Sequence, residues 1–375
     1  NVGETKEFLG KSLKVKLPEK GNKIVIEYKT SPNAAALQWL TPEQTADKNH
    51  PFLFTQSQAI LARTWLPCQD SPAIRFSYNA KVKTPKGLMA VMSATNPTEV
   101  NEDGFYQFEM KQPIPAYLMA LAIGNFEYAK IGNQTGVYAE PSVIKSAEYE
   151  FADMQKMVDA ASNLYGAYDW EQFDVIILPP SFPFGGMENP RITFATPTII
   201  AGDRSLTALI AHELAHSWSG NLVTNSNWND FWLNEGFTVY FERRIIEALY
   251  GKEYAEMLAL LGYQDLEATL AELKETPEDT RLKLDLDNRD PDDGMTDIAY
   301  EKGYSLLRLM ENTFGREDFD AFLKNYFQEN KFKSISEWSL TNNIPAFLGE
   351  FGALKTCDYT SRMKHYRAYI TFVKK

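Results

Sequence analysis

The chain has few cysteines, no long apolar run and fewer basic than acidic residues. Its two cysteines, Cys68 and Cys357, stand in different regions, so a structural disulfide is not expected and a reducing compartment fits. No run of about eighteen apolar residues occurs, which argues against a membrane-spanning helix. Asp and Glu exceed Lys and Arg by 50 to 38, and the net charge of −12 argues against binding to nucleic acid, which requires basic patches. We expect a cytoplasmic monomer.

Histidine is also scarce, with four in the chain, yet two of them lie four residues apart at His212 and His216. This spacing places both imidazoles on one face of a helix, one turn apart, where they can bind one metal ion. Apolar residues recur at three- and four-residue intervals and predict that helix over 205–219. Glu213 lies about 100° around the helix, near the metal but directed at the water that the metal binds.

A second helix, predicted over 232–250, supplies a third metal ligand, Glu235. Eighteen residues separate it from His216, enough for a turn that brings the two helices side by side. Two histidines and one glutamate leave the fourth tetrahedral position to water, which is the catalytic arrangement of zinc. Histidines that only cap or pack a helix are the alternative. Glu242, seven residues after Glu235, either accepts a hydrogen bond from a ligating histidine or forms an ordinary surface pair.

Two motifs resemble the gluzincin zinc aminopeptidases, the aminopeptidase-N-like family. They are His212-Glu213-Leu214-Ala215-His216 with Asn234-Glu235-Gly236, and upstream the exopeptidase motif Gly185-Gly186-Met187-Glu188-Asn189. The residues around both motifs are more similar to one branch of the family, which holds leukotriene-A-four hydrolase and bacterial aminopeptidases. The similarity runs over about 24–336.

The resemblance implies one Zn²⁺ ion and a role for each catalytic residue. Glu213 takes a proton from the attacking water and passes it to the leaving amine. Glu188 pairs with the free α-amino group of a peptide, which makes the enzyme an exopeptidase. Tyr300, in the sequence Tyr-Glu-Lys-Gly, donates a hydrogen bond to the oxyanion as the tetrahedral intermediate forms.

The resemblance also implies a set of substrate-binding positions, namely Gly185, Gly186, Met187, Gln58 and Asp292. The two glycines allow a bound peptide to approach the backbone closely. Without the neighbouring Met187-Glu188-Asn189, a plain turn would be a real alternative. Gln58 matches a position at the substrate entrance. Asp292 matches one linked to the opening of an epoxide, although an acidic loop with proline is usually a solvated turn.

The pattern along the chain predicts an α+β fold with two domains. An all-β domain over 1–138 contains antiparallel strands at 23–29, 74–82 and 105–110. The opening strands of the family's β-domain are missing, and the chain starts at Asn1, which predicts a fragment or a processed product. A thermolysin-like catalytic domain over 139–337 follows, with a helix at 147–165, a buried strand at 173–178 and helices at 253–272 and 301–314. Gly315 is the expected cap of the last helix.

The last segment, 338–375, departs from the family. Its residues 343–352 resemble a strand of a cellulase-type glycoside hydrolase barrel, in which the glutamate of Gly-Glu-Phe-Gly is the nucleophile. A retaining glycosidase needs a second carboxylate about 5 Å away, and the Asn-Glu-Pro motif that normally supplies it is absent. About forty residues also cannot form a barrel of about 250. Glu350 is therefore predicted not to be catalytic.

These observations predict a zinc aminopeptidase that removes amino-terminal residues from short peptides with a free N-terminus. Three alternatives stay open. An endopeptidase would use the same zinc ligands without an amine-binding glutamate. A bifunctional aminopeptidase and epoxide hydrolase would fit the same branch, and an inactive zinc-containing binding module would fit a truncated chain.

Overall fold

The computed structural model describes residues 1–335, so the predictions for Cys357, Glu350 and the segment 338–375 lie outside the described residues. The strands are β1 Val2–Lys6, β2 Gly10–Leu13, β3 Leu37–Leu40, β4 Phe52–Thr55, β5 Arg75–Lys83, β6 Met89–Met92, β7 Phe105–Pro115, β8 Leu121–Gly124, β9 Glu127–Lys130, β10 Thr135–Ala139, β11 Phe173–Ile177, β12 Gly186–Met187, β13 Ile192–Ala195, β14 Val223–Asn225 and β15 Lys333–Ile335. The helices are α1 Ile144–Glu150, α2 Met154–Tyr165, α3 Ala208–Ala215, α4 Trp232–Tyr250, α5 Lys252–Glu272, α6 Gly303–Phe314 and α7 Arg316–Glu329.

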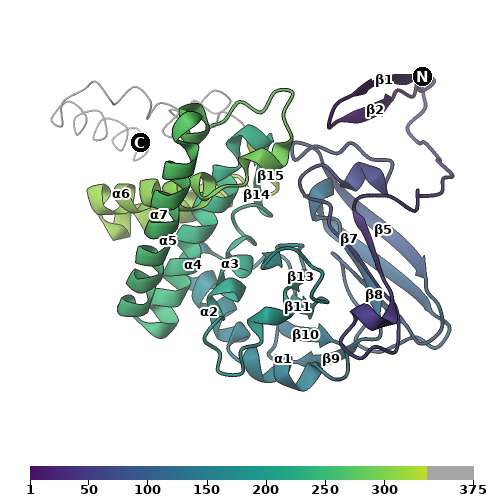
Figure 1. Cartoon of the computed structure of the whole chain (residues 1–375), viewed down its shortest axis with the longest axis horizontal. Coiled ribbons are helices and arrows are strands. Elements are labelled where there is room, and N and C mark those ends of the chain that lie inside the picture. Colours follow the sequence, from purple (N-terminus) through teal and green to yellow (C-terminus); the bar gives the residue numbers. More distant parts are fainter. Residues whose placement is uncertain (336–375) are drawn as a thin grey trace. The chain divides into compact units, whose positions relative to one another are not determined.

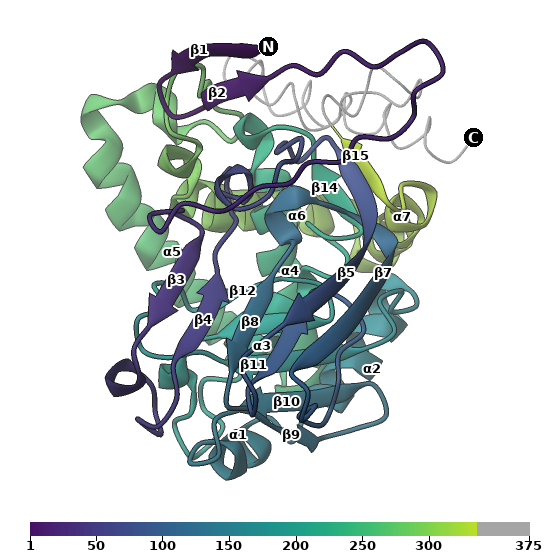
Figure 2. The same cartoon turned by 90° about the vertical axis from the view of Figure 1, so that its right-hand side faces the viewer.

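The N-terminal region consists of antiparallel strands, as predicted. Four of them form the sheet β3-β4-β8-β6, and β5 pairs with β7 (Figure 2). Burial alternates along β5 and along most of β7, because successive side chains of a strand point to opposite faces. The strands predicted at 74–82 and 105–110 are therefore confirmed. The strand predicted at 23–29 is wrong, since within residues 1–335 no strand pairs with this segment and its apolar side chains are exposed.

A mixed five-stranded sheet, ordered β12-β13-β11-β10-β9, supports the second region. Its centre is parallel, because β11 pairs in parallel with both β10 and β13. Every residue of β11 is buried, as expected for a strand covered on both faces, and the strand predicted at 173–178 is confirmed. The strands β9 and β10 belong to this sheet, although the predicted all-β domain over 1–138 had included them. The domain boundary at residue 138 stays a prediction.

Helix α4 is the centre of the helical part and contacts α3, α5 and α6 (Figure 1). Its bounds agree with the predicted helix at 232–250, and α5 and α6 agree closely with their predictions. Gly315, with a positive φ of 88°, ends α6 as expected.

Two helix predictions need correction. The helix predicted at 205–219 is regular only over Ala208–Ala215, because the chain then turns back through Gly220, whose φ is 107°. The single helix predicted at 147–165 is divided into α1 and α2 by a turn at 151–153. The residues Ile298–Lys302, just before α6, form a π-helical turn that the sequence did not indicate.

The α+β fold class is confirmed by an antiparallel N-terminal part and a mixed sheet with packed helices. Among residues 1–335, no helix has the combined length and apolar character that crossing a membrane requires.

Asp174, in the buried strand β11, makes stability depend on pH. Burial raises the pKa of its carboxyl from 3.8 to about 7, opposed by the hydrogen bond that Gln172 Nε2 donates to it at 2.8 Å. Because the pKa is raised in the folded state, this group's contribution to stability is complete below pH 3.8, its ordinary pKa. That contribution is lost as the pH rises through about 7. The free energy of unfolding should therefore fall less between about pH 4 and about pH 8 in Asp174→Asn than in the wild type, by about 4 kcal/mol. Urea denaturation at several pH values measures this.

The exposed Asp265 on α5 provides the control, because Asp265→Asn removes a carboxylate that stays solvated in both states. An unchanged pH dependence in Asp174→Asn, equal to that of the control, would contradict the prediction.

Candidate active site

The three predicted metal ligands come together where α3 packs against the start of α4. The Nε2 atoms of His212 and His216 are 3.2 Å apart, and each lies 3.4 Å from Oε2 of Glu235. All three residues can direct one donor atom to a common point, since these atoms lie within 4.8 Å of one another. Two imidazole nitrogens and one carboxylate oxygen at this spacing fit a single Zn²⁺ ion.

The other ring nitrogen of each histidine is held by a hydrogen bond. Nδ1 of His212 lies 3.0 Å from Oε2 of Glu242, so the hydrogen bond considered for Glu242 is present. Nδ1 of His216 lies 2.9 Å from Oδ1 of Asn234, and within 3.1 Å of the Ser219 carbonyl and the Thr238 hydroxyl. Acceptors at both Nδ1 atoms keep the proton there and leave both Nε2 atoms free to bind a metal.

Asn234 had no predicted role from the sequence. Its one signal was its place directly before Glu235, which puts the two side chains on adjacent positions of α4.

Two further carboxylates lie beside the predicted metal ligands. Glu188 and Glu213 are 4% and 5% exposed, and each can place an oxygen within 4.8 Å of the other and of a His216 nitrogen. Oε1 of Glu188 and Oε2 of Glu213 are buried without a hydrogen-bond partner among the described residues. Buried acceptors without partners are costly, so this arrangement suits a bound cation or hydrogen-bond donor.

Burial raises the pKa of Glu213 to about 7, opposed by the nearby His212 and His216. A carboxylate with a pKa near neutrality can both accept and return a proton.

The glycine pair before Glu188 leads into strand β12, which pairs antiparallel with β13. Gly186 lies in β12 itself, against the carboxylate of Glu213, so any side chain at this position would collide with Glu213. A Cβ on Gly185 would approach Leu209 Cδ1 to 3.2 Å. The absence of side chains here therefore makes room for Glu213 at the edge of the sheet.

Tyr300 lies in the π-helical turn and faces the predicted metal ligands. Its ring is stacked on His212, with ring centroids 6.2 Å apart and an angle of 17°, and it meets Phe231 edge-on. Burial, and then the charges of Glu235, Glu188 and Glu213, raise the pKa of the phenol well above 10.0. The hydroxyl therefore stays protonated and available as a hydrogen-bond donor.

These side chains line one cavity of about 440 Å³. The predicted residues that line it are Gln58, Gly185, Gly186, Glu188, His212, Glu213, His216, Glu235, Glu242 and Tyr300. The lining also contains Phe184, Leu209 and Met295, which are apolar residues with no motif of their own.

Two predicted substrate-binding residues, within the described part of the chain, do not line the cavity. Met187 is buried, and its Sδ accepts a hydrogen bond from Gln56 Nε2 at 3.3 Å. Asp292 lies in a turn at Pro291–Gly294. Its carboxylate accepts a hydrogen bond from the backbone amide of Ala59, the residue after Gln58. Their predicted roles in binding substrate stay predictions.

Comparison with known proteins gives two family matches. Residues 149–357 match the peptidase family M1 domain, and residues 4–118 match the peptidase M1 N-terminal domain. The chain therefore belongs to peptidase family M1, as the gluzincin resemblance predicted. The first match extends into the segment 338–375, for which the cellulase resemblance stays a prediction.

The chain is similar to several longer proteins. It is 46% identical to a leukotriene A-4 hydrolase from Xenopus laevis, over 90% of this chain and 58% of that protein. It is 44% identical to a leucine aminopeptidase 2 from Yarrowia lipolytica, over 90% of this chain and 54% of that protein. Among solved structures, yeast LTA4 hydrolase in complex with bestatin is similar with a TM-score of 0.83 and 39% identity, over 90% of this chain and 54% of that chain. This chain thus spans little more than half the length of these relatives.

Family membership agrees with the donor set in identifying the metal as zinc. Because Glu242 holds the imidazole of His212, we expect Glu242→Gln to weaken zinc affinity about 10- to 100-fold. Competition with a fluorescent chelator measures the dissociation constant.

Glu253→Gln, an exposed change at the start of α5, provides the matched control and should keep the affinity of the wild type. Equal affinities in both variants would mean that the His212–Glu242 hydrogen bond does not support the metal.

Proposed function

We propose that this protein is a zinc aminopeptidase that releases amino-terminal residues from short peptides. The main support is one cavity that contains the donor atoms of His212, His216 and Glu235 together with two buried carboxylates, each with an oxygen that has no partner within residues 1–335. The names of relatives that are leucine aminopeptidases agree with this function.

The proposed division of roles follows from the position of each group. Zn²⁺ held by the two histidines and Glu235 would supply a Lewis acid that lowers the pKa of water and polarises the peptide carbonyl. Glu188 binds the substrate's ammonium group, which gives a partner to the oxygen that has none in the described part of the chain. Glu213 accepts the proton of the attacking water and returns it to the leaving amine. Tyr300 donates its hydroxyl proton in a hydrogen bond to the developing oxyanion.

Hydrolysis of a chromogenic aminoacyl amide tests this proposal. Activity should be lost with a chelator and return with Zn²⁺. An N-acetylated version of the same amide should not be hydrolysed, because it has no ammonium group for Glu188. Hydrolysis of the acetylated amide would indicate an endopeptidase, and a folded, zinc-loaded but inert protein would indicate a binding module.

Epoxide hydrolysis is a second candidate, because the Xenopus relative is named leukotriene A-4 hydrolase. The residue that the family resemblance assigns to this chemistry, Asp292, accepts a hydrogen bond from the amide beside Gln58, and Gln58 lines the cavity. Incubation with a lipid epoxide, followed by analysis of the diol, tests this activity, and Asp292→Asn should change the product.

The domain boundaries after residues 138 and 337 belong to the same proposal, as do the monomeric state and the cytoplasmic location. Limited proteolysis and sedimentation analysis test the boundaries and the oligomeric state.

A further inference from the structure

Helix α4 contacts the segment that carries Tyr300 through two glycines. A Cβ placed on Gly236 would come within 2.7 Å of the Cα of Gly303, and the reverse also holds. The backbones of α4 and of the start of α6 therefore meet directly. Gly236 follows the metal ligand Glu235, and Gly303 lies three residues after Tyr300.

A buried ion pair joins the same two segments two turns further along α4. Arg243 lies seven residues after Gly236 and so on the same face of the helix. Its Nη2 lies 2.7 Å and 2.9 Å from the two carboxylate oxygens of Glu301, the residue next to Tyr300. The side chains of Arg243 and Glu301 are 7% and 12% exposed. A pair this well shielded from water is held more strongly than a surface pair.

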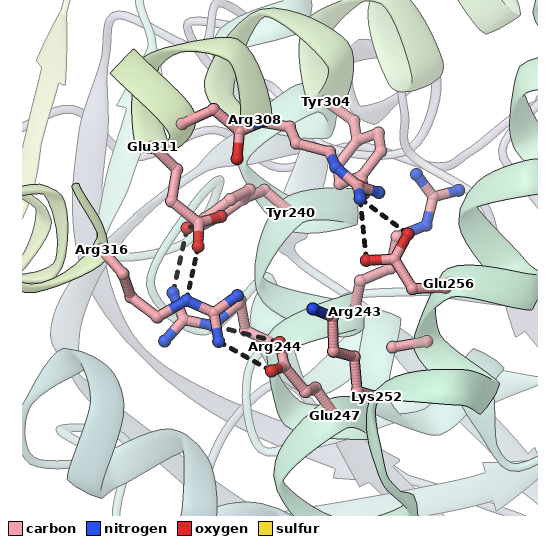
Figure 3. A pocket seen from close by; sticks show the side chains of 12 residues that line it. Tyr240, Arg243, Arg244, Glu247, Lys252, Glu256, Tyr304, Arg308, Glu311 and Arg316 are labelled. Carbon is pink, nitrogen blue, oxygen red and sulfur yellow. Dashed lines mark hydrogen bonds and ion pairs between the residues drawn. The ribbon is translucent and has the colours of Figure 1, made fainter. Parts of the chain in front are cut away.

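The surroundings are shaped to keep this pair in place. Gly262 of α5 lies against the carboxylate of Glu301, so a side chain there would displace it. The guanidinium carbon of Arg243 lies 3.9 Å from the ring centre of Tyr304 on α6. Figure 3 draws Arg243 and Tyr304 in a cavity of about 100 Å³, with Arg308 joined to Glu256 by a separate ion pair.

We propose that Arg243 and Glu301 are positioning residues that hold Tyr300 against the metal ligands. This inference rests on the proposed function, in which Tyr300 donates to the oxyanion. Such a donor is effective only when it is already directed at the charge that develops, and a small displacement lowers the rate greatly. Glu242, directly before Arg243, bonds His212, so α4 holds one metal ligand and the donor through adjacent residues.

The first test measures kcat and KM for the chromogenic aminoacyl amide. Glu301→Gln should lower kcat about 10- to 100-fold, with KM changed less than about twofold and zinc content unchanged, because only the transition state uses Tyr300. The double variant Arg243→Met/Glu301→Met should show the same loss of kcat as Glu301→Gln. It removes both charges, so no buried charge is left without a partner to oppose folding. An unchanged kcat in both variants would overturn the proposal.

Glu256→Gln is the matched control, since it breaks the more exposed Arg308–Glu256 pair of the same cavity without touching Glu301. It should keep the wild-type kcat. A loss of kcat equal to that of Glu301→Gln would assign the effect to the general stability of these helices and overturn the positioning role.

A double-mutant cycle separates positioning from structure. In a Tyr300→Phe background, Glu301→Gln should lower kcat no further, because the hydroxyl that it positions is already gone. A structural role would lower kcat by the same factor in both backgrounds, which would contradict the inference.

Amide hydrogen exchange gives a readout that does not depend on activity. Exchange over residues 298–303 should be faster in Glu301→Gln than in the wild type, and unchanged in Glu256→Gln. If the wild type hydrolyses no amide, the proposed function fails, while this comparison still decides whether the pair holds the Tyr300 segment. Equal exchange in all three proteins would overturn the inference.

Discussion

Glu213→Gln is expected to lower kcat for an aminoacyl amide about 1000-fold while the protein stays folded and keeps its zinc. The glutamine has the shape of the glutamate but cannot accept the proton of the attacking water. The proposed metal ligands are other side chains, so zinc content should not change. Steady-state kinetics together with metal analysis measures both quantities.

Glu267→Gln, an exposed change on α5, is the control and should keep full activity. A Glu213→Gln protein with more than about one tenth of the wild-type kcat would exclude Glu213 as the general base, since such groups contribute at least about 100-fold.

The second large effect is expected at Glu188. Glu188→Gln should lower kcat/KM for substrates with a free amino group about 100- to 1000-fold, because a buried carboxylate pairs with an ammonium far more strongly than a neutral amide does. Its oxygen Oε1 has no other partner among the described residues, so nothing else compensates for the lost charge. The kinetics of a free and an N-acetylated amide, measured side by side, quantify the change.

The same comparison contains its own control. Glu188→Gln should reduce the ratio of kcat/KM for the free amide to kcat/KM for the acetylated amide. Glu213→Gln should slow the hydrolysis of both amides without changing this ratio. An unchanged preference in Glu188→Gln would exclude this residue as the binding site of the amino terminus.

Elements with a strong local pattern could be predicted from the sequence. Helix α4 has the predicted bounds, and β5 and β7 show the alternating burial that their residues indicated. The four-residue spacing of His212 and His216 was sufficient to place both imidazoles on one side of α3 and its C-cap, because helix geometry is local.

Elements that depend on a distant partner were predicted poorly. The segment 23–29 has strand-forming residues, yet β-structure requires a neighbouring strand, and none pairs with it within residues 1–335. The π-helical turn at Tyr300 has no local signature either. It occurs where the glycine contact connects α4 to the start of α6 and the Arg243–Glu301 pair connects α4 to the turn itself.

The sequence by itself indicated which kinds of group to expect at the site. Residue type and spacing predicted roles for His212, His216, Glu213 and Glu235, whereas the predicted roles of Glu188 and Tyr300 rested on the resemblance of their motifs to the gluzincin family. Only the tertiary structure decided that Glu188 and Glu213 share a buried cavity with the proposed metal ligands, that Asn234 and Glu242 hold the histidines, and that Asp292 lies outside the lining. The physical reason is that residue type determines which bonds a group can form, whereas distance, burial and charge environment arise only when segments far apart in the chain pack together.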